Sequence, residues 1–204
     1  MHNMNSLARR IITRMLSRYI IKYYQRVRIF IFKVHSNNKN IIGKPNIQQP
    51  VLFVGFGKIT FGEGVSLGYF PSPLFFDSSI YIEARDKDSF IEVGRNCYIN
   101  NGAKIICDKT SILLGNDLLI GINFEVMDSD FHGISPEKRR DPDYLCSPVI
   151  IEDNVFIGNN VKIMKGVTIG RNSIIANSSV VVKSIPADSI AGGNPAKVIK
   201  SCYE

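Results

Sequence analysis

The sequence contains no tryptophan, only three histidines and only four cysteines among its 204 residues. The cysteines, Cys97, Cys107, Cys146 and Cys202, form neither a C-x-x-C pair nor a spacing with histidine that is typical of metal sites. Such thiols are usual in the reducing cytoplasm. The sequence therefore predicts a cytoplasmic protein with reduced thiols and no bound metal.

The sequence also lacks a long uncharged apolar run. A spanning helix needs about 18 such residues, and the longest candidate, residues 11–34, is interrupted throughout by arginine and lysine. No small-residue cleavage site follows an apolar run near the N-terminus, so no signal peptide is predicted. The net charge is +7, and the basic excess near the N-terminus could attract nucleic acid, anionic lipid or a phosphorylated substrate. No nucleic-acid-binding motif or aromatic platform accompanies it, which argues against nucleic acid.

An aliphatic residue recurs every six positions along much of the chain. The longest run is Ile151, Ile157, Ile163, Ile169, Ile175 and Val181; shorter runs are Val93, Ile99 and Ile105, then Leu114, Ile120 and Val126, with a fainter copy at Phe61 and Leu67. A period of six matches neither a helix face nor an alternating strand. It matches a coil with three flat sides, each of which turns one aliphatic residue inward. The expected corners carry Asn96, Asn116, Asn154, Asn160 and Asn172, because asparagine tolerates unusual backbone angles. The pattern predicts a solenoid rather than a β-sandwich.

A long polar segment interrupts the repeat between Val126 and Ile151. It reads D-S-D-F-H-G-I-S-P-E-K-R-R-D-P-D-Y-L-C-S-P and contains three prolines. We expect a loop over residues 127–149 that projects from the solenoid. Loops of this length in a compact fold usually serve a function, and a tolerated insertion is the alternative.

The N-terminal residues are predicted to form a basic helix. Arginine or lysine recurs every four residues from Arg10 to Arg26, beside an apolar side. Such a helix could lie on an anionic membrane surface, or it could pack across the open end of the solenoid. The expected organisation is a helix and linker over residues 1–50, a coil domain over residues 51–200 and a tail over residues 201–204.

The last repeats are followed by I-P-A-D-S-I-A-G-G-N-P-A-K-V-I-K, from Ile185 to Lys200. Together with the hexapeptide repeat and D-S-D-F-H at residues 128–132, this tail resembles the hexapeptide-repeat acetyltransferases. The resemblance covers about residues 51–200. It is closest to the maltose, galactoside and nodulation-factor acetyltransferases and to the bacterial O-antigen and capsule O-acetyltransferases. It implies an all-β solenoid, a left-handed parallel β-helix, with acetyl-coenzyme A as the acyl donor.

The resemblance implies that His132, at the start of the extended loop, is the catalytic base. The residues agree, because His2 and His35 lie outside the repeats and a sugar hydroxyl needs a base within hydrogen-bond reach. A carbonyl or a carboxylate should fix its tautomer; Asp128 and Asp130 are nearby, but each could instead cap the loop turn. No cysteine or serine beside His132 forms a nucleophile pair, so direct transfer is expected. One histidine in the repeats also argues against a zinc site of the β-helix carbonic anhydrase type, which needs three imidazoles.

Further site residues follow from the resemblance. The acceptor is expected to contact the stretch I-N-N-G-A-K-I-I-C-D, at Asn100 or Asn101 and at Asp108, although corner hydrogen bonding is an alternative role for these residues. The coenzyme A groove is expected to include Asn159, Asn177, Val182, Lys183, Gly193, Lys197 and Lys200, whose lysines would face the phosphates. Arg139 and Arg140 would contact an acidic sugar or a coenzyme phosphate, or form a solvated charge run.

The resemblance also implies a homotrimer with active sites between subunits, because three-sided prisms can pack around a threefold axis. The expected activity is O-acetyl transfer to a sugar hydroxyl of a bacterial surface polysaccharide, an O-antigen or capsule, or of its precursor. The basic helix would then contact the inner face of the membrane. The alternatives are an N-acetyltransferase of an amino or nucleotide sugar, a drug-modifying acetyltransferase and a non-catalytic β-helix scaffold.

Overall fold

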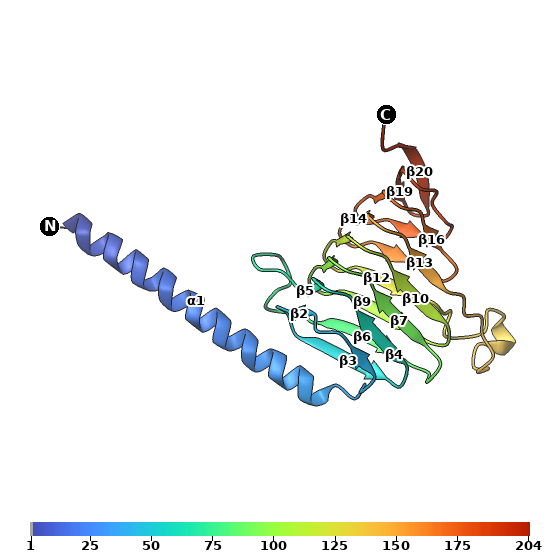
Figure 1. Ribbon diagram of the computed structural model, residues 1–204, viewed down its shortest axis with the longest axis horizontal. Coiled ribbons are helices and arrows are strands. Elements are labelled where there is room, and N and C mark those ends of the chain that lie inside the picture. Colours follow the sequence, from blue (N-terminus) through green and yellow to red (C-terminus); the bar gives the residue numbers. More distant parts are fainter. Residues whose placement is uncertain (1) are drawn as a thin grey trace.

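The structure is a three-sided parallel β-helix with one long helix before it and one loop that projects from its side (Figure 1). The computed structural model describes the backbone of residues 2–204 and the side chains of residue 16 and residues 19–204. The chain visits three sheets in turn, so the strands up to β18 pair with strands one coil away, and only the last two strands, β19 and β20, form an antiparallel hairpin. The predicted fold class, a left-handed parallel β-helix, is confirmed.

The three sheets have the following strand orders. Sheet A consists of β1 (Ile41–Ile42), β4 (Lys58–Phe61), β7 (Phe90–Val93), β10 (Ser111–Leu114), β13 (Val149–Ile151) and β16 (Thr168–Ile169). Sheet B consists of β2 (Asn46–Ile47), β5 (Ser66–Leu67), β8 (Tyr98–Ile99), β11 (Leu119–Ile120), β14 (Phe156–Ile157), β17 (Ile174–Ile175), β19 (Ser189–Gly193) and β20 (Ala196–Ser201). Sheet C consists of β3 (Val51–Gly55), β6 (Ile80–Ala84), β9 (Lys104–Cys107), β12 (Glu125–Met127), β15 (Lys162–Ile163) and β18 (Val180–Val181).

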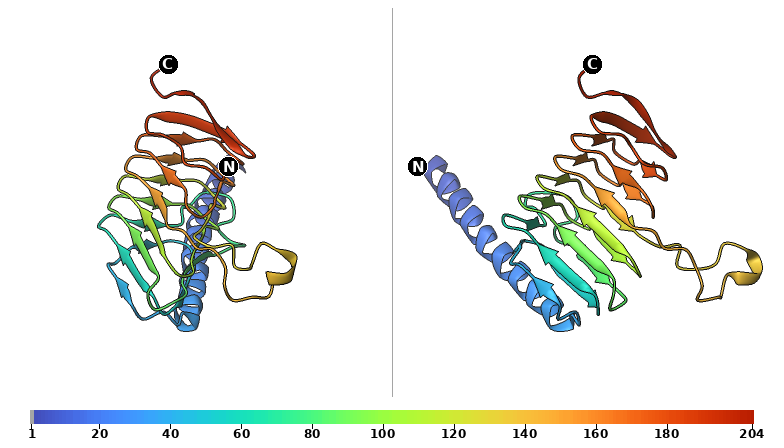
Figure 2. Two further views of the ribbon diagram at one scale, coloured as in Figure 1. Left: turned by 90° about the vertical axis from the view of Figure 1, so that its right-hand side faces the viewer. Right: turned by 45° about the vertical axis from the view of Figure 1, so that its right-hand side comes forward.

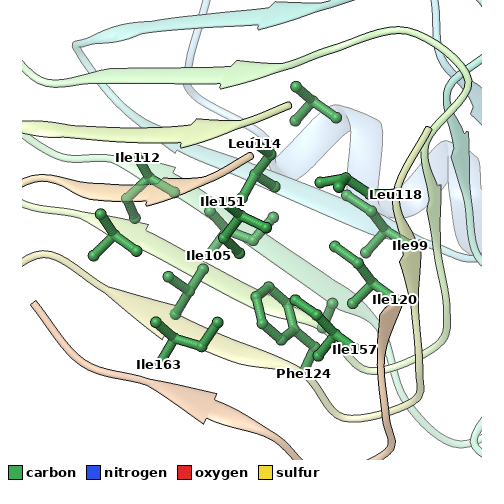
Figure 3. Close-up of a cluster of buried hydrophobic side chains, with 14 of the residues drawn as sticks. Ile99, Ile105, Ile112, Leu114, Leu118, Ile120, Phe124, Ile151, Ile157 and Ile163 are labelled. Carbon is green, nitrogen blue, oxygen red and sulfur yellow. The ribbon is translucent and has the colours of Figure 1, made fainter. Parts of the chain in front are cut away.

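The aliphatic residues of the repeat form columns inside the solenoid (Figure 3). In sheet C, for example, Val126 pairs in register with Ile105 on one side and with Ile163 on the other. All three side chains are 0% exposed. Because burial of apolar surface is the main favourable contribution to folding, these columns stabilise the coil.

Replacing Ile163 by alanine is expected to lower the free energy of unfolding by about 3 kcal/mol, because the change leaves a cavity in the core. Lys162 precedes it in β15, points outward and pairs with Glu125 at the surface. Lys162→Ala should therefore lower the free energy by less than about 1 kcal/mol. Urea denaturation followed by circular dichroism measures both variants. An equal decrease in the free energy of unfolding for the two variants would contradict the inward orientation of the aliphatic repeat residues.

The corners of the coil explain four of the five asparagines that the sequence places there. Asn96, Asn154, Asn160 and Asn172 have φ angles of 56°, 57°, 57° and 59°, in the left-handed region that asparagine tolerates. Stacked corners are also joined by side chains, since Asn154 Nδ2 donates to Asn172 Oδ1 at 2.9 Å. At one corner the left-handed residue is Asp117, with φ of 57°, and the neighbouring Asn116 bonds to Asp153 instead.

The end of α1 (His2–His35) and the segment after it cover the open edge of sheet C. The backbone N–H of Phe53, in the edge strand β3, donates to Ser36 Oγ at 3.0 Å, and the Asn37 N–H donates to Phe53 O at 3.1 Å. Gln25 Nε2 in the helix donates to Phe75 O, in the loop after β5, at 2.7 Å. The bonds of Ser36 and Asn37 satisfy the exposed edge of β3, whereas the helix that precedes them extends away from the solenoid (Figure 1).

The first coil starts within the segment that the sequence predicts to be a linker. β1 pairs with β4 and β2 pairs with β5, so residues 41–47 already belong to the solenoid rather than to a linker ending at residue 50. Ile41 and Ile47 are six residues apart and pair with Ile59 and Leu67, so the period of six already holds in this segment. None of the described helices is long and apolar enough to cross a membrane.

Candidate active site

The loop that carries His132 leaves the solenoid at the corner between sheets C and A. It runs from the end of β12 to the start of β13, and a bridge between Ser129 and Cys146 joins its two ends. Phe131 adopts a left-handed φ of 61°, which turns the chain sharply just before His132. The tip, with the short helix η1 (Pro136–Lys138), projects away from the solenoid (Figure 1). The narrow base therefore holds His132 close to the coil.

The imidazole of His132 is exposed and is oriented by the backbone. Its Nδ1 lies 2.9 Å from Gly133 O. A carbonyl oxygen can only accept, so Nδ1 carries the hydrogen and the neutral ring leaves Nε2 unprotonated. A carbonyl thus fixes the tautomer, and Nε2 can accept a proton from a substrate hydroxyl.

His132 borders an open hollow of about 520 Å³ together with Asp130, Ile134 and Arg139. Asp130 Oδ1 pairs with Lys165 Nζ at 2.9 Å. Its other oxygen, Oδ2, is buried and has no hydrogen-bond partner among the described residues. The hollow therefore brings a base and a guanidinium together beside a carboxylate that is paired with a lysine, which suits a polar acceptor.

Asp128 anchors the loop to the coil below it. Its side chain is 0% exposed. Oδ1 accepts from the Asp108 N–H at 2.6 Å, and Oδ2 accepts from the N–H and the hydroxyl of Thr110, each at 2.8 Å. The sequence leaves two roles open for Asp128, which are to orient His132 or to cap a turn. These bonds support the second role, because they satisfy backbone donors of the turn between β9 and β10.

An ionic network with buried carboxylates and a half-exposed arginine supports the loop from the neighbouring coil. Asp108, which is 1% exposed, accepts from Arg85 Nη1 at 3.1 Å and from Ser129 Oγ at 3.3 Å. Arg85 also pairs with Glu83 at 2.8 Å and lies 4.9 Å from the centre of the Phe131 ring. The hydrogen bond to Glu83 raises the pKa of Arg85, so its charge is permanent. Asp108 was predicted to contact the acetyl acceptor. In this chain its carboxylate is buried and bonded to Arg85 and Ser129, so it holds the base of the loop.

The two predicted acceptor asparagines lie in different environments. Asn101 is 0% exposed, and its side chain bonds to the N–H and carbonyl of Tyr69 at 3.0 Å and to Pro73 O at 2.9 Å. It therefore holds the loop after β5. Asn100 is half-buried and lines a groove of about 330 Å³ on the outer side of sheet B, which Asn159 also borders. Asn100 is the asparagine that is open to a ligand.

The groove on sheet B has an apolar floor. Tyr98, Leu119 and Phe156 pair in register across three strands and are 52%, 50% and 47% exposed. The loop leaves at the corner between sheets C and A, and sheet B is the side opposite that corner. Figure 1 shows the loop and the strands β5 and β14 on opposite sides of the solenoid. One chain therefore does not bring His132 to its own groove.

The predicted coenzyme A residues also fall in separate places. They are Asn159 and Asn177 at the corner after β14 and β17, Val182 and Lys183 at the corner after β18, and Gly193, Lys197 and Lys200 in the β19–β20 hairpin. Asn159 and Asn177 belong to one stack, because the Asn159 N–H donates to Asn177 Oδ1 at 2.7 Å. The two corners lie on either side of sheet C, so one chain does not gather the set into one groove.

Sequence reasoning missed Arg85, Glu83 and Lys165. Arg85 is 23 residues from Asp108, and the two meet because β6 and β9 stack one coil apart. Lys165 follows β15, one coil beyond the loop base, since β12 and β15 are paired. The inserted loop lies between Asp130 and Lys165 in the sequence, so counting the six-residue repeat forward from Asp130 does not reach Lys165.

The described side chains include all four cysteines, of which Cys97 and Cys107 are buried. They include no group of three or more potential metal ligands. All four cysteines are free. Burial raises the pKa of the Cys97 thiol to about 11 and that of Cys107 further, so neither is a thiolate nucleophile.

Known proteins share the repeat and the coil. Residues 148–183 match the family described as bacterial transferase hexapeptide, six repeats. The galactoside O-acetyltransferase of Escherichia coli K12 is 38% identical over 112 residues, which cover 55% of this chain and 54% of that protein. The polysialic acid O-acetyltransferase of Escherichia coli O1:K1 is 36% identical over 114 residues, which cover 56% of this chain and 37% of that protein.

A solved structure matches over more of the chain. The hexapeptide-repeat acetyltransferase of Vibrio cholerae superposes with a TM-score of 0.51 and 27% identity, over 87% of this chain and 80% of that chain. The sequence matches, by contrast, span about half or less of the two curated relatives. The repeat over residues 148–183, the three-sided coil and these likenesses show that the chain is similar to hexapeptide-repeat acetyltransferases in this part of its sequence and in its fold.

Proposed function

We propose that the chain transfers the acetyl group of acetyl-coenzyme A to a hydroxyl group of a carbohydrate, with His132 as the general base. The observation that carries the proposal is the bond between His132 Nδ1 and Gly133 O, which leaves Nε2 of an exposed ring free to take a proton. The named activities of the galactoside and polysialic acid relatives support a carbohydrate acceptor.

The chemistry needs one base and no covalent enzyme intermediate. Nε2 of His132 takes the hydroxyl proton while the acceptor oxygen attacks the thioester carbon. The tetrahedral intermediate then breaks its C–S bond, and the leaving thiolate takes the proton from the imidazolium. Backbone N–H groups at a coil corner would stabilise the oxyanion. His132 is neutral again at the end of the cycle.

The long anionic donor substrate suits the last coils of the solenoid. Lys183, Lys197 and Lys200 are exposed there and would contact its phosphates. Backbone amides at the corner of Asn159 and Asn177 would bind its pantetheine arm in the way that a strand adds to a sheet.

A homotrimer would complete the site. His132 and the groove of Asn100 lie on opposite sides of one chain, so the loop of one protomer would face sheet B of the next. Three such contacts close into a ring. The exposed Tyr98, Leu119 and Phe156 would be covered in that ring, which supports the arrangement.

Phe156→Asp is expected to convert the trimer largely to monomers, because it places an unpaired charge in an apolar interface. Size-exclusion chromatography with light scattering should give three times the chain mass for the wild type and one for the variant. Lys87→Asp, at a fully solvated position on the solenoid, should leave the trimer intact. A monomeric wild type that retains activity would contradict the shared site.

The proposed acceptor is a sugar of a bacterial surface polysaccharide or its precursor, acetylated in the cytoplasm beside the membrane. The test is release of the coenzyme A thiol with a panel of neutral and acidic glycans, with the site of acetylation read by mass spectrometry. Transfer to amino sugars or drugs alone would replace the carbohydrate hydroxyl as the acceptor. If calorimetry showed that the protein does not bind coenzyme A, the alternative of a non-catalytic β-helix scaffold would be favoured.

A further inference from the structure

The positive charge of the chain is concentrated before the solenoid. Residues 1–62 contain eleven of the 25 lysines and arginines and none of the 18 aspartates and glutamates, so the rest of the chain is formally negative. Most of these charges lie on α1, which extends away from the coil toward its N-terminal end (Figure 1, Figure 2). The molecule therefore carries one strongly basic arm.

One side of that arm is apolar and has no partner among the residues that the structure describes. Its members recur every three or four residues and are 40% to 73% exposed: Leu16, Tyr19, Ile20, Tyr23, Val27, Phe30, Ile31 and Val34. Residues at this spacing share one face of a helix. We call this set the apolar stripe. The helix contacts the solenoid with another side, through Gln25 and Arg28.

The apolar stripe continues onto the solenoid at one edge and meets basic residues at the other. Tyr24 lies one turn after Ile20, and its ring is 6.3 Å from that of Phe76 in the loop after β5. Phe70 follows at 6.0 Å from Phe76. At the opposite edge, the exposed Lys22, Arg26 and Lys33 lie beside the stripe. The result is a wide apolar surface with a basic border.

We infer that this surface docks on an anionic lipid membrane, with α1 lying in the plane of the headgroups. An apolar helix face with a basic border and interfacial tyrosines is the composition that binds such surfaces. The inference extends the proposed location but is independent of acetyl transfer. Docking through α1 would hold the proposed active sites next to a membrane-bound acceptor.

A second copy of the chain is a poorer occupant of the stripe. Helices that associate through an apolar seam usually pair opposite charges along its borders. Here the border residues are all basic, and α1 has no acidic residue to pair with them. A nucleic acid would neutralise the charge but would leave the apolar side chains exposed to water.

Flotation of the full-length protein with vesicles tests the inference. The wild type should bind vesicles of phosphatidylcholine with phosphatidylglycerol, bind phosphatidylcholine alone at least about tenfold less, and be released by salt. The combined change Lys22→Gln, Arg26→Gln and Lys33→Gln should weaken binding about fivefold per charge, or about a hundredfold. Lys87→Gln, Arg95→Gln and Arg171→Gln, which remove three exposed charges from the solenoid, should change it less than about twofold.

The apolar part of the surface needs its own variant. Tyr23→Gln, Val27→Gln and Phe30→Gln keep helix-forming residues and should weaken vesicle binding at least about tenfold. Unchanged binding by this variant would mean adsorption by charge alone and would overturn the inference. A smaller oligomer in this variant, without loss of vesicle binding, would assign the stripe to self-association and overturn it as well.

The same preparations separate this inference from the proposed function. Acetyl transfer to a small soluble acceptor should be the same in the wild type and in both helix variants. Full activity in a wild type that binds no vesicles would overturn the docking surface alone. Vesicle binding by a protein that transfers no acetyl group would overturn the catalytic proposal alone.

Discussion

His132→Ala is expected to lower kcat by about 10²- to 10⁴-fold, which is the usual contribution of a general base. The imidazole is held by the Gly133 carbonyl with Nε2 exposed on the hollow that it shares with Asp130 and Arg139. Without it no described group in that position takes the proton of the acceptor hydroxyl. The KM for acetyl-coenzyme A should change little, because the predicted donor residues lie elsewhere. Initial rates of thiol release at varied donor and acceptor concentrations measure both constants.

A matched control exists in the same chain. The Nδ1 of His35 also lies 2.9 Å from a backbone carbonyl, that of Ile31, but the residue ends α1, far along the chain from the loop. His35→Ala should retain full activity. A full kcat in His132→Ala would remove the proposed mechanism.

The sequence predicted the coil because its core rule is local and repeated. Each side of the solenoid needs one inward aliphatic residue, so Ile157, Ile163 and Ile169 are enough to fix the period. The corner asparagines follow from the same rule, apart from the one-residue difference at Asp117. The first coil was assigned to the linker although Ile41 and Ile47 keep the spacing of six, because only these two repeat positions precede the proline at residue 50.

The site was predicted less completely because stacking, rather than sequence spacing, assembles it. His132 stands out since it is the one histidine within the repeats. Asn101 and Asp108 were expected to face the acceptor, yet both are buried with their polar atoms bonded to other loops. No pattern along the chain distinguishes a corner side chain that turns inward from one that turns out. Arg85 joins Asp108 only because two coils lie on top of each other.

Asp128→Ala is expected to lower the free energy of unfolding by about 4 kcal/mol, because it leaves several buried donors without an acceptor. The carboxylate accepts from the backbone N–H groups of Asp108, Lys109 and Thr110, at 2.6, 3.2 and 2.8 Å, and from the Thr110 hydroxyl. These donors belong to the turn under the loop base, so acetyl transfer should fall as well. Urea denaturation and initial rates measure the two effects.

Asp128→Asn separates a structural anchor from a residue that orients the base. The amide keeps the size of the side chain and one acceptor oxygen, but its NH₂ group faces N–H donors where an oxygen stood. An anchor predicts intermediate stability, about 2 kcal/mol below the wild type, with kcat restored when low temperature keeps the loop folded. A partner of His132 predicts the reverse, a stable protein whose kcat stays low at every temperature. Because the Gly133 carbonyl already holds Nδ1, we expect the first result, and the second would return Asp128 to the catalytic machinery.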